Sequence, residues 1–100
     1  VVEDNDTILQ IFTRILEQAG FQADQASSAE DGIKAISSNS YNVALIDMRL
    51  RDDSFGGFRV AEAADRTKTW LVAISGSYLG HEEEELTSRF DEVVEKPISA

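Results

Sequence analysis

Short apolar runs recur along the chain, and four of them end on polar residues. The clearest run covers residues 43–46, which is typical of a strand buried on both faces, and Asp47 follows at once. Because parallel strands bring their carboxyl ends to one edge of a sheet, the residues after the other runs matter as well. These runs are Val1-Val2 before Glu3 and Asp4, residues 70–74 before Ser75, and Val93-Val94 before Glu95 and Lys96.

Between these runs, apolar residues recur at helical spacing. Residues 8–19 predict a first helix that Gly20 ends, and Ser27 or Ser28 is the expected N-cap of a second helix. The remaining segments are a short edge strand at 21–26, a loop at 51–57, a short third helix over 58–64 and a helix-compatible stretch over 81–90.

Strand and helix therefore alternate through the whole chain, which predicts an α/β fold with a doubly wound parallel sheet and helices on both faces. The chain has 100 residues, of which 42% are hydrophobic, and this suits one domain over residues 1–100. Since the first strand is cut to two residues and no Met precedes it, we expect a fragment trimmed at both ends of a longer protein.

The composition excludes several classes of function. With 19 acidic and 9 basic residues the formal net charge is −10, which argues against binding nucleic acid and favours cationic partners or metal ions. The absence of cysteine excludes disulfides and thiolate chemistry, and fits a reducing cytoplasm. No apolar run approaches the roughly 20 residues that span a bilayer, so we expect no membrane partner.

The polar residues at the strand ends are expected to converge on one edge of the sheet. The carboxylates of Glu3, Asp4 and Asp47 would repel one another there, and their hard oxygen atoms favour Mg²⁺ as the neutralising cation. Ser75 can donate to one phosphoryl oxygen, and Lys96 offers a compact positive charge to another. Because phosphoryl transfer needs mainly positioning and charge stabilisation, this set predicts that Asp47 becomes an aspartyl phosphate.

With these motifs in order and at matching spacing, the chain resembles the receiver domain of two-component response regulators, the CheY-like family. The resemblance covers nearly every residue. It rests on VVEDN at the start, GFQADQASSAEDGIKAI for the second strand and helix, NVALIDMRL around Asp47, LVAISG, and FDEVVEKPIS at the end. It implies the flavodoxin/CheY-like sheet of five parallel strands in the order 2-1-3-4-5, with the fifth helix of the family missing from this sequence.

The resemblance also implies a magnesium site. Asp4 would ligate Mg²⁺ directly, together with the phosphoacceptor Asp47. Glu3 would act largely through a metal-bound water, and the main-chain carbonyl of Arg49 would complete the protein ligands.

The remaining roles implied by the resemblance concern the phosphoryl group. Asp47 would receive it from a phosphohistidine on a sensor histidine kinase or a histidine phosphotransfer domain. Ser75 would bond a phosphoryl oxygen and move with phosphorylation, and Lys96 would pair with the group. The domain would be a cytoplasmic regulatory module and not an enzyme, and phosphorylation would switch its partners or its assembly, a homodimer being one such assembly.

Departures from the family pattern keep other functions open. Val93 stands where the family usually carries Tyr or Phe, which favours a pseudo-receiver, a protein-interaction module that phosphorylation does not control. Arg51 replaces the usual proline of the loop after Asp47. An aspartate-nucleophile phosphatase would need a second Asp two residues after the nucleophile, and Arg49 at that position disfavours this class.

Overall fold

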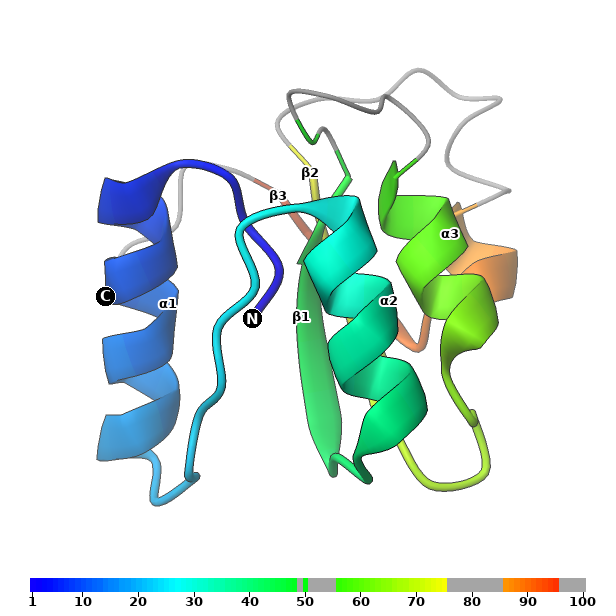
Figure 1. The fold of residues 1–100 in the computed structure, drawn as a ribbon, viewed down its shortest axis with the longest axis horizontal. Helices are drawn as coiled ribbons and strands as arrows, with labels where there is room; N and C mark the ends of the chain where they lie inside the picture. Colours follow the sequence, from blue (N-terminus) through cyan, green and yellow to red (C-terminus); the bar gives the residue numbers. More distant parts are fainter. Residues whose placement is uncertain (49, 51–55, 76–85, 96–100) are drawn as a thin grey trace.

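The computed structural model describes residues 1–48, 50, 56–75 and 86–95, which contain both helices and strands (Figure 1). The elements, in chain order, are α1 (Asp6–Gln18), α2 (Ala29–Ser38), β1 (Val43–Asp47), α3 (Gly56–Ala63), β2 (Trp70–Ser75) and β3 (Glu92–Glu95). Residues 86–89 form a further helical turn between β2 and β3. The α/β class predicted from the apolar runs is therefore confirmed, although between α1 and α2 the predicted strand is present only as an isolated bridge at Ala26.

One predicted boundary is wrong. Gly56 and Gly57 were assigned by composition to the loop at 51–57, but they form the start of α3 and are buried. The other residues of that loop lie outside the described part of the chain. A pair of glycines is typical of loops, but glycine is also needed where a helix lies close to another backbone. Here the packing of α3 favours the helix over the loop.

The sheet is parallel, with β1, β2 and β3 adjacent in that order. Two isolated parallel bridges extend it, one joining Val2 to Ile46 and the other joining Val2 to Ala26. Across the sheet the order is therefore Ala26, Val2, β1, β2 and β3, which is the predicted order 2-1-3-4-5. The predicted first two strands are reduced to single bridges, since Val1-Val2 offers few residues for pairing on either side.

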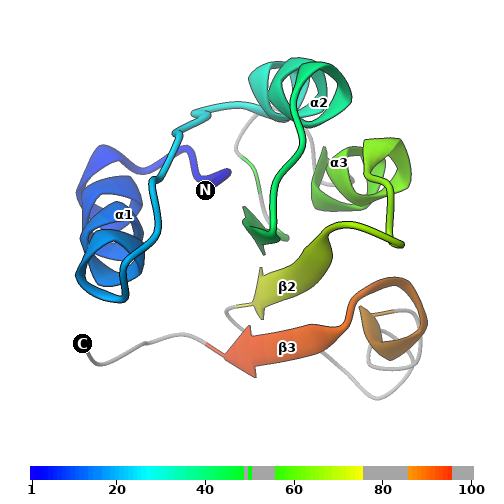
Figure 2. The same ribbon diagram turned by 90° about the horizontal axis from the view of Figure 1, so that it is seen from below.

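Helices cover both faces of this sheet, as a doubly wound fold requires. Figure 2 shows α1 on one face and α2 with α3 on the other, and all three helices begin at the edge where the strands end (Figure 1). The main core contains Ile46, Val60 and Leu71, all fully buried, while α1 buries Leu9 and Phe12. None of the described helices is long and apolar enough to cross a bilayer.

The helix termini follow the residues that predicted them. The side chain of Ser28 accepts a hydrogen bond from the Asp31 N–H, which makes Ser28 and not Ser27 the N-cap of α2. Beyond the end of α1, Gly20 has a φ of 96°, a left-handed conformation that glycine adopts at little cost. The prediction that Gly20 ends the first helix is confirmed.

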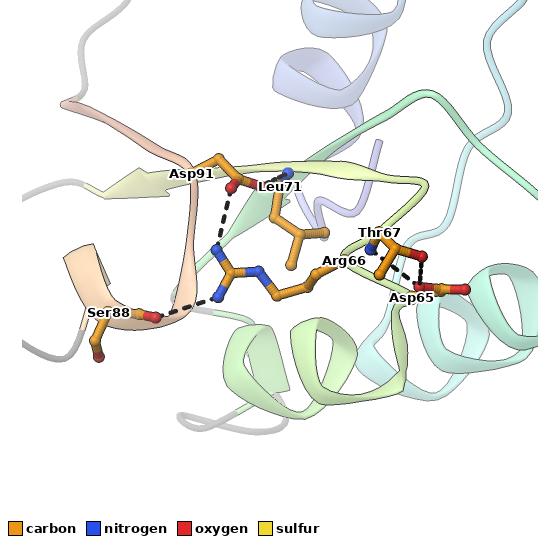
Figure 3. Close-up of polar contacts among 6 residues, drawn as sticks. All are labelled: Asp65, Arg66, Thr67, Leu71, Ser88 and Asp91. Atoms are coloured by element: carbon orange, nitrogen blue, oxygen red, sulfur yellow. Dashed lines mark hydrogen bonds and ion pairs between the residues drawn. The ribbon is translucent and has the colours of Figure 1, made fainter.

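The entry to β3 is held by the carboxylate of Asp91 (Figure 3). Asp91 donates its N–H to the Leu71 carbonyl at 2.8 Å, and its Oδ2 accepts the Leu71 N–H at 2.7 Å. Arg66 donates to Asp91 Oδ1 at 3.1 Å and to the Ser88 carbonyl at 3.2 Å. The bond from the Leu71 N–H, and to a smaller extent Arg66, hold the pKa of Asp91 below its ordinary value of 3.8.

Replacing Asp91 with Asn removes the charge that strengthens these bonds. We expect the free energy of unfolding near neutral pH to fall by about 1 kcal/mol, since the carboxylate and its Arg66 partner are partly exposed. Because the folded-state pKa is lowered, this contribution is present above the ordinary pKa of 3.8 and is lost as the pH falls through the folded-state value. Urea denaturation of both proteins across this range measures it, and a difference that does not change with pH would contradict the assignment.

Candidate functional site

Three carboxylates meet at the carboxyl end of β1. Glu3, Asp4 and Asp47 each offer one oxygen atom, and these atoms all lie within 4.8 Å of one another. Glu3 and Asp47 are almost wholly buried, with exposed fractions of 1% and 2%, while Asp4 is half-buried. The structure thus brings together the three acidic residues that the strand ends were expected to gather, although Asp47 is far from Glu3 and Asp4 in the sequence.

Backbone pairing of the first residues places Glu3 beside β1. The Val2 N–H donates to the Leu45 carbonyl at 2.8 Å, and the Asp47 N–H donates to the Val2 carbonyl at 2.9 Å. On the other side, the Glu3 N–H donates to the Ala26 carbonyl at 3.0 Å. The backbone before the cluster is therefore bonded on both sides, so the distance between the carboxylates follows from the sheet register.

The residue after the cluster both orients Glu3 and starts α1. The Asn5 N–H donates to Glu3 Oε2 at 3.2 Å, and the Asn5 side chain accepts the Ile8 N–H at 3.1 Å as the N-cap of the helix. The sequence Glu3-Asp4-Asn5 thus ends the pairing with β1, supplies two carboxylates and turns the chain into α1.

Ser75 lies at the same edge of the sheet. It is the last residue of β2 and is only 3% exposed. Since Asp47 is opposite Ile74 in the register of β1 and β2, Ser75 is one residue further along the neighbouring strand. Its partner on the other side is Glu95, the last residue of β3. The predicted hydroxyl therefore comes from the strand next to the acidic residue proposed as acceptor.

Two predicted site residues, Arg49 and Lys96, lie outside the described residues, and their roles stay predictions. Val93, the position at which the family pattern is broken, is described. It is half-buried, packs against the main core and lies opposite Ala73 in the register of β2 and β3. A branched aliphatic side chain there lacks the ring on which an aromatic switch depends.

The negative charges at the site favour the binding of a cation. Three carboxylates at this separation repel one another, and burial of two of them removes water that would screen the repulsion. The cluster offers only carboxylate oxygen atoms, which fit hard divalent cations such as Mg²⁺ or Ca²⁺ and do not fit a soft, sulfur-seeking ion. The donor set thus agrees with the predicted magnesium site.

One contact at this site was not predicted from the sequence. Gly57, in the first turn of α3, lies against the backbone of Asp47 and Met48. The pair Gly56-Gly57 looks like an ordinary loop signal, so only the packing reveals that the second glycine touches the strand that carries Asp47.

The arrangement as a whole defines a class of protein. In open parallel α/β sheets, ligands bind beyond the carboxyl ends of the strands at the point where the strand order reverses. Here the order reverses between Val2 and β1, and the acidic cluster lies at that point. The family model described as the response regulator receiver domain matches residues 1–100, so the chain belongs to that family. No curated protein matches the chain.

Solved structures with the same fold are similar to this chain over 98% of its length. A CheY-like receiver domain from Methylobacillus flagellatus is 36% identical with a TM-score of 0.79, and the chain covers 84% of it. The receiver domain of a sensor histidine kinase from Pseudomonas aeruginosa, with a magnesium ion coordinated in its active-site cleft, is 20% identical with a TM-score of 0.79, and 83% of it is covered.

A response regulator protein from Burkholderia pseudomallei, solved with a phosphorylated aspartic acid, a calcium ion and citrate, is 17% identical with a TM-score of 0.83. The match includes 98% of this chain but only 58% of the length of that protein. Together these likenesses confirm the α/β fold that the strand and helix pattern predicted, in the CheY-like form that the resemblance implied.

The crowding of the carboxylates gives a testable consequence in metal-free protein. Asp4→Asn removes one negative charge from the cluster, so we expect the free energy of unfolding in EDTA to rise by about 1 kcal/mol. The same change should remove the stabilisation that added divalent cation gives to the unmodified domain. Thermal or urea denaturation with and without the cation measures both effects.

Asp6→Asn is the matched control for Asp4→Asn, because Asp6 is an exposed acid in the first turn of α1 and is not part of the cluster. We expect it to leave the response to cation unchanged and to lower stability slightly, since an acid near a helix N-terminus is favourable. A loss of metal-free stability in Asp4→Asn as large as in this control would contradict repulsion within the cluster.

Proposed function

We propose that this receiver domain accepts a phosphoryl group on Asp47 in a two-component phosphorelay, with Mg²⁺ held by the acidic cluster. The observation that carries the proposal is the position of Asp47: a buried carboxylate at a strand end, within 4.8 Å of two further carboxylate oxygen atoms. A carboxylate in that position is a nucleophile only when a cation offsets the surrounding negative charge.

In the proposed metal site, Asp4 and Asp47 would bind Mg²⁺ directly, Glu3 would act through a water molecule, and the Arg49 main-chain carbonyl would complete the protein ligands. The cation supplies charge stabilisation for the phosphoryl oxygen atoms and for Asp47 itself. The bond from the Asn5 N–H to Glu3 Oε2 orients a carboxylate that is not required to contact the metal. The magnesium ion coordinated in the receiver domain from Pseudomonas aeruginosa supports this assignment.

The transfer proposed here is an in-line displacement at phosphorus. A carboxylate oxygen of Asp47 forms the new oxygen–phosphorus bond as the phosphorus–nitrogen bond of a phosphohistidine breaks, and the imidazole nitrogen keeps the electron pair. Ser75 donates a hydrogen bond to one phosphoryl oxygen, and Lys96 pairs with another. The phosphorylated aspartic acid in the structure from Burkholderia pseudomallei supports the choice of an aspartate as acceptor.

The donor in this proposal is a sensor histidine kinase or a histidine phosphotransfer domain of the cytoplasm. The domain is regulatory and turns over no substrate of its own beyond gaining and losing the phosphoryl group. Phosphorylation then changes which partner it binds or how it assembles, including as a homodimer. The net charge of −10 favours protein or metal partners over nucleic acid for this domain.

A second function, that of a pseudo-receiver, is favoured by one observation. Val93 packs half-buried against the core at the position where the family usually has the aromatic ring that turns with the switch hydroxyl. A domain without that ring can keep the fold and serve as an interaction module that phosphorylation does not control. The acidic cluster favours the phosphoacceptor function instead, because an interaction module has no need for three adjoining carboxylates.

The mass of the intact protein distinguishes the two functions. We expect one phosphoryl adduct after incubation with Mg²⁺ and acetyl phosphate, and no adduct in EDTA. In Asp47→Asn the adduct should fall by at least about 100-fold, because a neutral amide replaces the nucleophilic carboxylate.

Asp6→Asn is again the control, since it removes an acid of the same type near the site without touching the cluster. It should be phosphorylated like the unmodified domain. A folded protein that acquires no adduct and binds no Mg²⁺ would contradict the phosphoacceptor function and leave the interaction module. An adduct that persists in Asp47→Asn would place the acceptor on a different residue.

A further inference from the structure

The first turn of α3 touches the backbone of the residue proposed as phosphoacceptor. A Cβ atom added at Gly57 would lie 2.9 Å from the carbonyl oxygen of Asp47, 3.0 Å from Met48 Sδ and 3.1 Å from Met48 Cα. Contacts between carbon and a backbone oxygen at 2.9 Å are too short to be accommodated without movement. Any side chain at position 57 must therefore displace either this part of β1 or the helix.

The backbone at the end of β1 has little freedom to move. The Asp47 N–H is bonded to the Val2 carbonyl at 2.9 Å, and the Met48 N–H is bonded to the Ile74 carbonyl of β2 at 3.0 Å. The carbonyl of Asp47 lies between these two bonded amides. A shift of that carbonyl changes the position of Asp47 relative to Val2, and so relative to the neighbouring residue Glu3.

The same side of α3 also packs against α2. Val60 of α3 is fully buried, and a Cβ added at Gly32 of α2 would lie 3.1 Å from Val60 Cγ2. Since Val60 lies three residues after Gly57, one side of α3 packs against both α2 and the end of β1. Strain introduced at position 57 is then shared with the residues that carry the carboxylates.

We infer that Gly57 is a positioning residue of the acidic site. Its missing side chain lets α3 rest against the carbonyl of Asp47, and this contact holds the Asp47 carboxylate at its distance from those of Glu3 and Asp4. The inference rests on the proposed function, because it assigns the contact to the geometry of the cation and phosphoryl site and not merely to the stability of the fold.

Gly57→Ala tests this inference, with Gly32→Ala as its matched control. Both changes add one methyl group to a buried glycine of a helix and gain the same intrinsic helix propensity. At Gly32 the three atoms nearest to the added Cβ would be side-chain methyl groups, at 3.0 Å and 3.2 Å from Val2 and at 3.1 Å from Val60. Gly32→Ala therefore crowds the same layer of the core without pressing on the backbone of β1.

The readouts are the Mg²⁺ dissociation constant from calorimetry, the rate of phosphoryl adduct formation from acetyl phosphate at saturating Mg²⁺, and the thermal midpoint in EDTA. We expect Gly57→Ala to bind Mg²⁺ about 10-fold more weakly, as for other residues that support a metal ligand from behind. The rate should fall by up to about 100-fold, since the nucleophile is displaced. Gly32→Ala should keep the affinity and the rate, whatever its thermal midpoint.

Three outcomes would overturn the inference while leaving the proposed function in place. The first is an affinity and a rate in Gly57→Ala equal to those of the unmodified domain. The second is the same loss in Gly57→Ala and Gly32→Ala, which would show a general effect of core crowding. The third is a Gly57→Ala protein with no unfolding transition, which would mean that the contact serves the fold as a whole. If the unmodified domain itself neither binds Mg²⁺ nor forms an adduct, the proposed function fails, and the inference fails with it.

Discussion

The pairing of the first three residues between Ala26 and β1 is the interaction on which the site depends. Four backbone hydrogen bonds of 2.8–3.0 Å hold this short segment, two toward β1 and two toward Ala26. Without them Glu3 and Asp4 would not lie beside Asp47, because more than 40 residues of chain separate the two parts of the cluster. A parallel sheet brings these residues together without a local sequence motif, because it places strand ends from distant parts of the chain at one edge.

The same arrangement creates an electrostatic cost that a bound cation reduces. Two nearly buried carboxylates and a third half-buried one lie within 4.8 Å of one another, so the metal-free site is under repulsion. A cation that binds here adds its binding free energy to the stability of the fold. The site is therefore coupled to the packing behind it, in which α3 contacts the backbone of Asp47 and Met48. Because of this coupling, we expect substitutions at Gly57 to change the positions of the carboxylates.

Much of this organisation could be predicted from the sequence, because it depends on patterns that the chain displays directly. Runs of apolar residues with polar ends predicted the strands and the three acidic residues, and the caps at Ser28 and Gly20 follow from local backbone chemistry. The strand order came from the resemblance to the receiver family. The start of α3 could not be predicted, since Gly56-Gly57 has the composition of a loop and is helical only because packing against β1 requires it. The hydrogen bonds that Asp91 makes with Arg66 and Leu71 could not be predicted either, because no sequence motif marks these residues as partners.

The central claim is that the end of β1 and the start of the chain form one divalent-cation site. The measurement that tests it most directly is a magnesium titration of the metal-free domain, followed residue by residue through backbone amide NMR shifts. The account predicts saturable binding to one site, with the largest shifts at Glu3, Asp4, Asp47 and Met48. Saturable binding whose shifts centre on the exposed acids of β3, Glu92 and Glu95, or no saturable binding at all, would contradict it.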